Sequence, residues 1–189
     1  MKKSKCVFLD RDGTINVEVS YLHRVEDVQL IKNVPEAINL LNHNGYKVIV
    51  LSNQSGVARG YFSEEDVRGV NREIDRLIRL KGGEIEDFYF CPHYLGGKIQ
   101  KYAIQCSCRK PGIGMIGRAA QDYDIDISNS YMIGDKASDV KMANNAGCRS
   151  ILVKTGYGLE ECSNIAIEAD FIAEDLLDAA KWIIGEHYD

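Results

Sequence analysis

Two acidic residues, Asp10 and Asp12, stand two positions apart in the segment DRDGT, directly after a short apolar run at residues 6–9. Gly13 permits a turn there, and a turn would let both carboxylates face one pocket. Because carboxylates this close repel each other, they need a cation or a shared proton. A hard divalent ion such as Mg²⁺ accepts one or two carboxylates and keeps places for water and phosphate oxygens. The alternative is a solvated acidic turn that binds nothing.

Three more polar segments follow predicted strands, and each carries groups that could bind a phosphate or a metal. The first offers a hydroxyl and several amides for phosphate oxygens, from Ser52, Asn53, Gln54 and Ser55. Arg109 and Lys110 are cations that can grip phosphoryl oxygens and neutralise their charge. Asp135, followed by Lys136, could supply a third acid for a metal. Taken singly, these segments also fit a polar turn, a surface basic pair, and a helix start that favours acids such as Asp139.

A cluster of cysteines and one histidine follows the third predicted strand with the spacing C-x-H-x12-C-x-C. Its members are Cys91, His93, Cys106 and Cys108. Three thiols and one imidazole make a closed tetrahedral zinc site, and a closed site is structural because no position is left for a substrate. Zn²⁺ there would staple the loop at about residues 91–108 and aim Arg109 and Lys110 inward. A Cys106–Cys108 redox pair, or thiols unrelated to one another, is the alternative.

Short β-rich runs alternate with helical patterns along the chain, and these elements must position the polar segments. Strands are predicted at residues 6–9, 47–51, 87–91, 131–133 and 150–153, and helices at 35–44, 63–80, 113–123, 140–146 and 175–184. Such alternation predicts an α/β fold with a mainly parallel sheet. In open sheets of this kind, ligands bind beyond the carboxyl ends of the strands, where the polar segments fall. We expect residues 1–189 to form a single domain.

The composition makes several classes of function improbable. Hydrophobic residues make up 45% of the 189 and charged residues 27%, which is enough apolar material for a sizeable core. The formal net charge of −5, without a basic run, disfavours a nucleic-acid partner. The sequence has neither an apolar run long enough to cross a bilayer nor the apolar region of a signal peptide, and six cysteines are too sparse for a secreted disulfide scaffold. We expect a cytoplasmic monomer with no membrane partner.

The four polar segments, in this order along the chain, resemble the four motifs of the haloacid dehalogenase (HAD) superfamily of phosphatases, and the match runs over nearly the whole sequence. The resemblance implies a doubly wound domain with helices on both faces and without a large cap. It implies Asp10 as the nucleophile and Asp12 as the general acid and base. It further implies that Ser52 and Lys110 hold the transferring phosphoryl group. Mg²⁺ would be held by Asp10, the backbone carbonyl of Asp12, and Asp135.

Three segments resemble one branch of this superfamily, which holds heptose-bisphosphate and histidinol-phosphate phosphatases. They are DRDGTIN, NQSGVARG and CPH…CSCRKP with a long loop between, and all three favour the heptose side. The resemblance implies a Mg²⁺-dependent phosphomonoesterase that removes the 7-phosphate of a small phosphorylated sugar, a heptose 1,7-bisphosphate, on the route to nucleotide-activated heptose. It also implies substrate contacts from Glu18, Tyr21, Arg59, Arg109 and Lys136, and one of these cations would meet the second phosphate.

Two stretches depart from the pattern of that branch and leave the substrate open. Val19 stands where a polar ring is usual, in the segment expected to contact the sugar, and residues 112–114 (GIG) lack a usual second proline. A histidinol-phosphate phosphatase or another small-metabolite phosphatase is therefore the first alternative. A zinc-stabilised binding module is disfavoured by the retained acid pair, and a nucleic-acid 3′-phosphatase by the negative charge. Cys6 and Cys148 are predicted core residues, and Cys162 has no predicted role.

Overall fold

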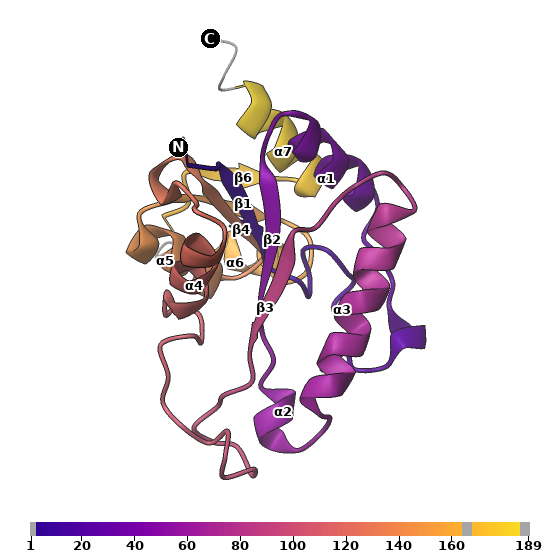
Figure 1. Ribbon diagram of the computed structural model, residues 1–189, viewed down its shortest axis with the longest axis vertical. Coiled ribbons are helices and arrows are strands. Elements are labelled where there is room, and N and C mark those ends of the chain that lie inside the picture. The colour runs from indigo at the N-terminus through magenta and orange to yellow at the C-terminus, as the bar shows by residue number, and fades with distance from the viewer. Residues whose placement is uncertain (1–2, 164–167, 186–189) are drawn as a thin grey trace.

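The computed structural model describes residues 3–163 and 168–185, which build one parallel sheet covered by helices (Figure 1). The strands are β1 Cys6–Leu9, β2 Lys47–Asn53, β3 Asp87–Cys91, β4 Tyr131–Gly134, β5 Arg149–Val153 and β6 Phe171–Ala173. They lie in the order β3-β2-β1-β4-β5-β6, and all neighbouring pairs are parallel. The chain therefore starts in the middle of the sheet and winds outwards in both directions, which confirms the predicted doubly wound topology.

Helices cover both faces of the sheet. The longer ones are α1 Val34–His43, α3 Glu64–Arg79, α4 Gly114–Asp122, α5 Ala137–Ala146 and α7 Leu176–Gly185. The short ones are α2 Gly56–Arg59, α6 Gly158–Glu161 and the 3-10 helices η1 Val25–Asp27 and η2 Ile127–Asn129. Helices α1, α3 and α7 pack on one face, and α4 and α5 on the other (Figure 1). No connection within the described ranges carries a large cap domain, as expected.

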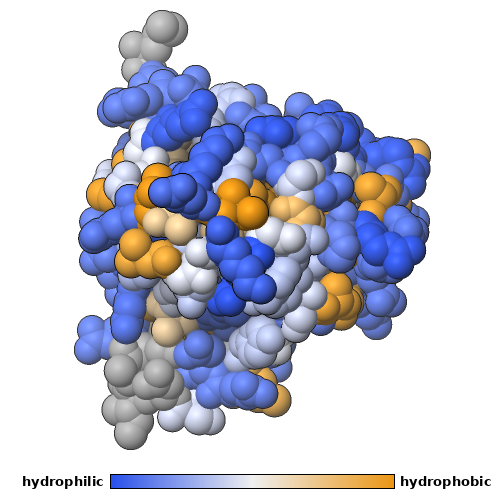
Figure 2. All heavy atoms as spheres, turned by 90° about the horizontal axis from the view of Figure 1, so that it is seen from below, coloured by the Kyte–Doolittle hydropathy of each residue, from blue (hydrophilic) through white to orange (hydrophobic). Residues whose placement is uncertain are grey.

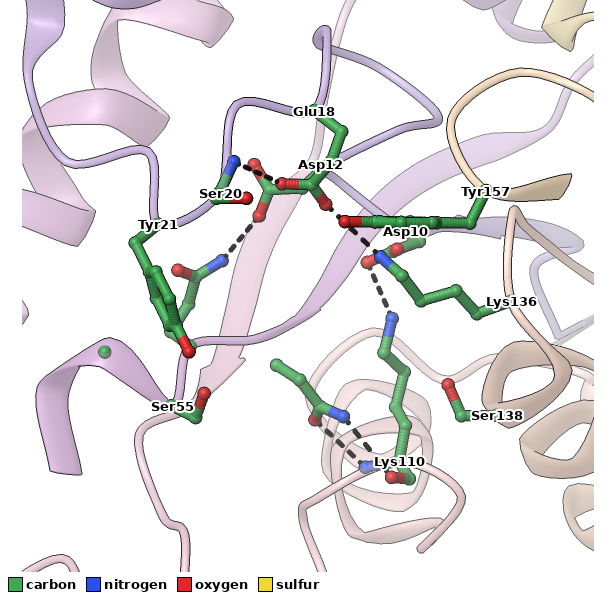
Figure 3. Close-up of a pocket in the computed structure, with 13 residues that line it drawn as sticks. Asp10, Asp12, Glu18, Ser20, Tyr21, Ser55, Lys110, Lys136, Ser138 and Tyr157 are labelled. Carbon is green, nitrogen blue, oxygen red and sulfur yellow. Dashed lines mark hydrogen bonds and ion pairs between the residues drawn. The ribbon is translucent and has the colours of Figure 1, made fainter. Parts of the chain in front are cut away.

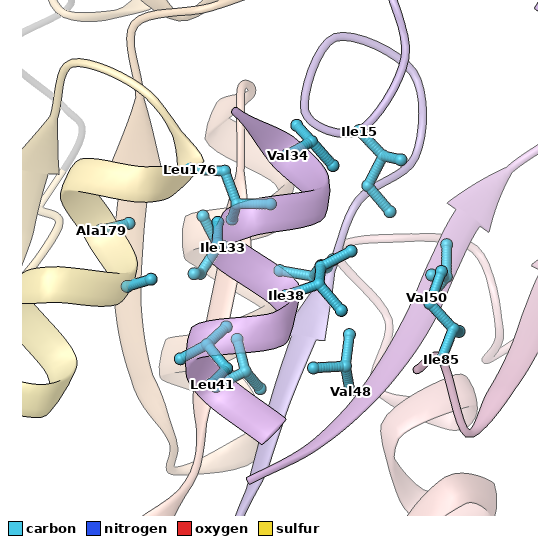
Figure 4. Packing of buried hydrophobic residues seen from close by; sticks show 14 of the residues in the cluster. Ile15, Val34, Ile38, Leu41, Val48, Val50, Ile85, Ile133, Leu176 and Ala179 are labelled. Atoms are coloured by element: carbon cyan, nitrogen blue, oxygen red, sulfur yellow. The ribbon is translucent and has the colours of Figure 1, made fainter. Parts of the chain in front are cut away.

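The central strands are buried on both faces, so their side chains alternate between two hydrophobic clusters. Val7 and Leu9 of β1 belong to the cluster under α1, α3 and α7, where Ile38 of α1 also packs (Figure 4). Cys6 and its neighbours on the opposite face belong to the cluster under α4 and α5. Burial on both faces explains why the strands read as continuous apolar runs. Cys148 is buried in the second cluster, so both cysteines predicted for the core are confirmed there.

The first turns of two helices are set by side-chain caps. At the start of α3, the Ser63 N–H donates to Asp66 Oδ2 at 2.7 Å, and the Asp66 N–H donates to Ser63 Oγ at 3.2 Å. This reciprocal pair is a capping box at the start of the helix. Helix α5 begins at Ala137, earlier than predicted, because Asp139 accepts the Lys136 N–H at 3.1 Å. The earlier start fixes Asp139 close to the end of β4.

Three short elements have no clear signal in the sequence. Strand β6 spans three residues, and α2 and α6 are single turns of four residues each. Such segments are stabilised by their neighbours in the fold rather than by their own periodicity. Cys162 directly follows α6 and is half-buried. Within the described ranges, none of the helices is both long and apolar enough to span a membrane.

Candidate active site

Polar segments from several strand ends meet in one pocket of about 360 Å³ (Figure 3). The predicted site residues that line it are Asp10, Asp12, Glu18, Tyr21, Asn53, Gln54, Ser55, Lys110 and Lys136. Sequence reasoning missed four further lining residues, which are Ser20, Gly56, Ser138 and Tyr157. Figure 2 shows the molecule from below, relative to the view of Figure 1. This face, on which α2 lies, is mostly hydrophilic with small separate hydrophobic patches. The pocket therefore suits a small polar ligand.

Lys110 contacts the candidate nucleophile directly. Its Nζ lies 2.6 Å from Asp10 Oδ1 and 2.6 Å from Asp139 Oδ1, and it donates to the Leu51 carbonyl at 3.0 Å. Burial by itself would lower the pKa of Lys110, but the charges of Asp10 and Asp139 outweigh burial and raise the pKa. Lys110 is therefore protonated at neutral pH. Asp139 caps α5, as its sequence position indicates, and in addition pairs with this lysine.

Asn53 holds the backbone of Lys110 at two points. Asn53 Oδ1 accepts the Lys110 N–H at 3.0 Å, and Asn53 Nδ2 donates to the Lys110 carbonyl at 3.3 Å. Both ends of the side-chain amide are thereby engaged, although the sequence suggests that this amide serves phosphate oxygens. The residue lines the pocket, but its side-chain hydrogen bonds place the lysine.

Asp135 is fully buried at the end of β4, and two glycines make room for it. A Cβ atom at Gly13 would lie 2.2 Å from Asp135 Oδ2, and one at Gly156 would lie 2.3 Å from it. Both glycines also have positive φ, +88° and +56°, which favours glycine on conformational grounds. The Tyr157 N–H donates to the same oxygen at 2.9 Å. Gly13 thus serves the predicted turn and the close approach of a third acid.

Three carboxylates gather in this site, since oxygens of Asp10, Asp135 and Asp139 all lie within 4.8 Å of one another. Burial, aided by the charge of Asp10, raises the pKa of Asp135 to about 7. Burial likewise raises the pKa of Asp139 to about 6. Asp135 Oδ1 accepts no hydrogen bond and lies 3.6 Å from Lys136 Nζ. A crowded, all-oxygen donor set with an unbonded buried oxygen fits Mg²⁺.

Asp12 is turned towards a buried arginine. Arg11 Nη2 donates to both carboxylate oxygens of Asp12, at 3.0 and 2.9 Å, and Arg11 itself has no exposed surface. Asn16 Nδ2 and Gln54 Nε2 each donate to Asp12 at 2.9 Å. Burial alone would raise the pKa of Asp12, but the charge of Arg11 and these hydrogen bonds lower it. The carboxylate is therefore ionised and firmly held beside the pocket.

The upper wall of the pocket in Figure 3 comes from the segment that follows the acid pair. Glu18 accepts from Lys136 Nζ at 3.4 Å, and Lys136 Nζ lies 4.8 Å from the centroid of the Tyr157 ring. Ser20 and Tyr21 have left-handed backbones, with φ of 50° and 64°, which is rare for residues with side chains. The Ser20 N–H donates to Glu18 Oε1 at 2.8 Å and so supports this turn. The turn leaves the Tyr21 ring at the mouth of the pocket.

Four predicted site residues lie outside the pocket lining, namely the buried Asp135 described above and Ser52, Arg59 and Arg109. Ser52 is buried near the end of β2, with 1% of its surface exposed. Arg59 ends α2 and Arg109 precedes Lys110, and both guanidinium groups lie over the ring of Tyr94. The two arginines are therefore neighbours of the pocket rather than part of its wall. Roles for Ser52, Arg59 and Arg109 stay predictions.

The cysteine–histidine cluster forms as the spacing predicts. The Sγ atoms of Cys91 and Cys108 are 3.0 Å apart, and those of Cys91 and Cys106 are 3.6 Å apart. His93 Nδ1 lies 3.3 Å from Cys108 Sγ. These separations exceed a disulfide bond and approach the edges of a tetrahedron around a metal with Zn–S bonds of about 2.3 Å. Hydrogen bonding from Cys91 lowers the pKa of Cys108 to about 5, which favours the thiolate that zinc binds.

Comparisons with known proteins agree with the site. A family model described as HAD-hydrolase-like matches residues 107–179. The D-glycero-D-manno-heptose-1,7-bisphosphate 7-phosphatase of Thermosynechococcus vestitus is 46% identical over 184 residues, which is 94% of each chain. The D-glycero-alpha-D-manno-heptose-1,7-bisphosphate 7-phosphatase of Photorhabdus laumondii is 41% identical over 87% of this chain and 91% of its own.

A solved structure extends the likeness to three dimensions. The D,D-heptose 1,7-bisphosphate phosphatase from B. bronchiseptica, complexed with magnesium and phosphate, has a TM-score of 0.87 and 29% identity, covering 96% of this chain and 99% of its own. A doubly wound sheet with an acid pair, a lysine and a further acid at its carboxyl edge defines the class of HAD-like hydrolases. Because the identity extends over nearly the whole chain, the protein belongs to the family of heptose-1,7-bisphosphate 7-phosphatases within that class. Its phosphatase relatives set aside the non-catalytic binding module.

Proposed function

We propose that the protein is a Mg²⁺-dependent phosphomonoesterase that removes the 7-phosphate of D-glycero-D-manno-heptose 1,7-bisphosphate, in the synthesis of nucleotide-activated heptose. The identity of 46% over nearly the whole length of a relative with that name carries the proposal. The meeting of Lys110 and Asp135 with Asp10, which lines the pocket, supports it independently. As parts of the same proposal, residues 1–189 form a single domain that acts as a cytoplasmic monomer.

In the first chemical step, Asp10 attacks the phosphorus and forms an aspartyl-phosphate. A carboxylate is a weak nucleophile, but this covalent intermediate divides hydrolysis into two easier displacements. Lys110 Nζ lies 2.6 Å from Asp10 Oδ1 in the free protein. When the phosphoryl group is transferred, the lysine would also stabilise the negative charge of its oxygens. Ser52 is proposed to hold the same group through its hydroxyl. Because Ser52 is buried, the backbone turn after β2 would share this role.

In both steps, Asp12 transfers the proton. It would protonate the leaving alkoxide and later activate a water molecule for attack on the aspartyl-phosphate. For this, its side chain must exchange some of the hydrogen bonds from Arg11, Asn16 and Gln54 for contacts with the substrate. Asp12 and its donor Gln54 both line the pocket, so the exchange takes place next to the bound substrate.

Two different metals fit the two ligand clusters. The carboxylates of Asp10 and Asp135, with the backbone carbonyl of Asp12, would hold Mg²⁺, and the structure adds Asp139 to this group. When bound, Mg²⁺ offsets negative charge on the carboxylates and the phosphoryl oxygens. Zn²⁺ would join the four residues of the cysteine–histidine cluster and hold the loop that precedes Arg109 and Lys110.

The remainder of the sugar would contact residues around the pocket mouth. Glu18 and Tyr21 offer a carboxylate and a ring to its hydroxyls, and Gln54 and Ser55 add amide and hydroxyl groups. Lys136 lies between Glu18 at the mouth and the buried Asp135, so it would serve the transferring phosphate. The second, anomeric phosphate is left to the arginines outside the wall. One charge-assisted hydrogen bond to it, worth roughly 1.5–3 kcal/mol, would favour a bisphosphate about ten- to a hundredfold.

The test is a comparison of kcat/KM across phosphorylated metabolites. The panel contains both anomers of the heptose bisphosphate, fructose 1,6-bisphosphate and histidinol phosphate, with Mg²⁺ present throughout. We expect one heptose anomer to lead by at least about tenfold. A preference for histidinol phosphate would move the protein to the neighbouring branch. Equal rates on all four would mean that Val19 and its neighbours have loosened the sugar site.

A further inference from the structure

Two arginines beside the pocket share one aromatic ring. The Cζ atom of Arg59 lies 4.2 Å from the centroid of the Tyr94 ring, and the Cζ atom of Arg109 lies 5.4 Å from the same centroid. Arg59 ends α2, whereas Tyr94 lies in the loop of the cysteine–histidine cluster that leads to Arg109. Arg59 also lies 5.9 Å from the ring of Tyr21, which lines the pocket. Tyr94 thus joins cations from two separate segments, next to the substrate pocket.

These two arginines differ from most others in the chain. The arginines that pair with carboxylates are Arg11, Arg24, Arg68, Arg72, Arg76, Arg79 and Arg118. Within the part of the chain that the structure describes, no ion pair to a carboxylate forms at Arg59 or Arg109. Arg59 Nε is buried without a hydrogen-bond partner, and Arg109 Nη1 donates to the His93 carbonyl at 3.2 Å. Two guanidinium groups that contact one ring and have no carboxylate partner suit an anion.

The position of the Tyr94 ring is fixed by its own loop. The Tyr94 N–H donates to the Tyr102 carbonyl at 3.0 Å, and the Tyr94 carbonyl accepts the Gly97 N–H at 2.9 Å. A Cβ atom at Gly96 would lie 2.7 Å from Tyr94 Cε1, so a side chain there would displace the ring. The ring therefore occupies a place that the glycine leaves open.

The loop is also docked on α2, directly beside Arg59. The Ile99 N–H donates to the Ala58 carbonyl at 2.9 Å. A Cβ atom at Gly97 would lie 2.7 Å from the same carbonyl oxygen, so the two backbones are in close contact. This contact brings Tyr94 over the arginine that follows Ala58. The cysteine–histidine loop and α2 thus form one unit at the pocket mouth.

We propose that Tyr94 is a positioning residue that sets the preference for a bisphosphate, by holding Arg59 and Arg109 together for the second phosphate. The inference rests on the proposed function and adds to it a residue that does not touch the substrate. Attraction of both cations to the ring face offsets the repulsion between them. Two preset guanidinium groups then need little ordering when a phosphate dianion binds, which strengthens binding.

The first test compares Tyr94→Leu and Tyr94→Phe with the unchanged protein. Steady-state kinetics with Mg²⁺ are measured on the heptose 1,7-bisphosphate and on the heptose 7-phosphate. Losing the ring is expected to lower the bisphosphate preference about 5- to 30-fold, chiefly through KM. Tyr94→Phe keeps the ring and should therefore retain most of the bisphosphate preference of the unchanged protein. An equal loss on both substrates, or no rescue by phenylalanine, would overturn the proposal.

The second test detects the arrangement itself and needs no substrate. Phenylglyoxal modifies accessible guanidinium groups, and mass spectrometry gives the labelling rate of each arginine, with the exposed Arg118 as internal reference. Labelling of Arg59 and Arg109 should rise several-fold in Tyr94→Leu. Unchanged labelling would overturn the proposal even if the heptose substrate is wrong. If labelling rises in Tyr94→Leu but the bisphosphate preference does not change, the arrangement exists and the proposed role in specificity is overturned.

Two neighbouring positions provide a graded variant and a matched control. Gly96→Ala keeps Tyr94 but forces its ring to move, so the bisphosphate preference should fall in the same direction as in Tyr94→Leu. Leu95→Ala removes an adjacent side chain that is 69% exposed, and it should change neither labelling nor preference. Metal analysis of every variant should find the same zinc content. An effect of Leu95→Ala as large as that of Tyr94→Leu would show a general disturbance of the loop and overturn the proposal.

Discussion

The acid-lined pocket and the cysteine–histidine cluster each bring their candidate ligand atoms within 4.8 Å of one another, but they differ in chemistry and exposure. The carboxylate cluster at the pocket offers only oxygens, and its members Asp135 and Asp139 have no exposed surface. The cluster offers three sulfurs and one nitrogen, and three of its four residues are partly exposed. Hard oxygens with room for a ligand suit catalysis, whereas a closed sulfur set suits a staple.

The two regions lie next to each other in the sequence, with one residue between them. Cys108 closes the cysteine–histidine cluster, and Lys110 reaches Asp10. Arg109 between them donates to the carbonyl of His93, a member of the cluster. In the proposed function, the acid-lined pocket performs the reaction, while the cysteine–histidine cluster holds the segment that carries Arg109 and Lys110. Damage to the first should therefore abolish turnover, and damage to the second should lower stability first.

The largest effect is expected for Asp10→Asn. An amide cannot form the aspartyl-phosphate and is a weak metal ligand, so turnover should fall by about 10⁴-fold or more. The fold should persist, as far-UV circular dichroism would show. Asp27→Asn, an exposed acid paired with Arg24, is the control and should keep its turnover. Near-normal turnover of the Asp10 variant would mean that another group is the nucleophile.

Replacing Cys108 tests the other region. Protein purified without added metal should contain about one zinc per chain, and Cys108→Ser should lose it. The Tm is expected to fall by about 5–15 °C, at about 2–4 °C per kcal/mol for a chain of this size. Activity measured well below the new Tm should fall less than in the Asp10 variant. Cys162→Ser, a half-buried thiol outside the cluster, should keep the zinc.

One result of this experiment would contradict the zinc assignment. Zinc-free protein in which Cys106 and Cys108 form a disulfide would return the cluster to the redox alternative. The two Sγ atoms are 3.3 Å apart, so this alternative remains chemically accessible to an oxidant.

Asn53→Ala sharpens the link between the regions. It removes two hydrogen bonds to the Lys110 backbone and should lower kcat about 5- to 100-fold while changing the Tm only slightly. Asn145→Ala is the matched control, because Asn145 donates to the carbonyl of the next residue, Pro111, from the surface. A loss confined to KM would instead assign Asn53 to substrate binding, as its sequence position suggests.

The smallest effect concerns pH and Mg²⁺. The pKa of Asp135 is raised to about 7 in the folded protein, against about 3.9 for an ordinary aspartate. The folded state therefore binds more protons between these values, and the metal-free protein loses stability as the pH rises through them. Added Mg²⁺ should raise the Tm by a few degrees at pH 8 and by less at pH 5.5. Equal gains at both pH values would contradict this, and Asp135→Asn should abolish the difference.

The sequence predicts the frame of the fold better than its contacts. The strands at Cys6–Leu9 and Asp87–Cys91 have the predicted bounds, because buried parallel strands leave continuous apolar runs. Strand β6 was missed because three residues are too few for a pattern. Asp139 was read as a helix start, which is a local feature, while its ion pair with Lys110 joins residues far apart in sequence.

The same limit applies to the candidate site. Residue types and their order along the chain predict Asp10, Lys110 and Asp135 as candidates, and the structure brings Lys110 and Asp135 to Asp10. The local sequence does not predict that Tyr157 donates its N–H to Asp135, because that contact depends on how the turn after β5 folds back. Asn53 shows the converse, because the sequence predicts a ligand contact for its amide and does not predict its hydrogen bonds to the Lys110 backbone.

The most direct test of the account is to trap the covalent intermediate. Because Asp12 is proposed to serve both steps, the intermediate is trapped in the unchanged protein, by a rapid denaturing quench during turnover of the heptose bisphosphate. Borohydride reduces an acyl phosphate to an alcohol, and peptide mass spectrometry then locates the changed residue. The account predicts homoserine in place of Asp10, dependent on substrate and Mg²⁺. Reduction at another acid, or turnover with no trapped residue, would contradict Asp10 as the nucleophile.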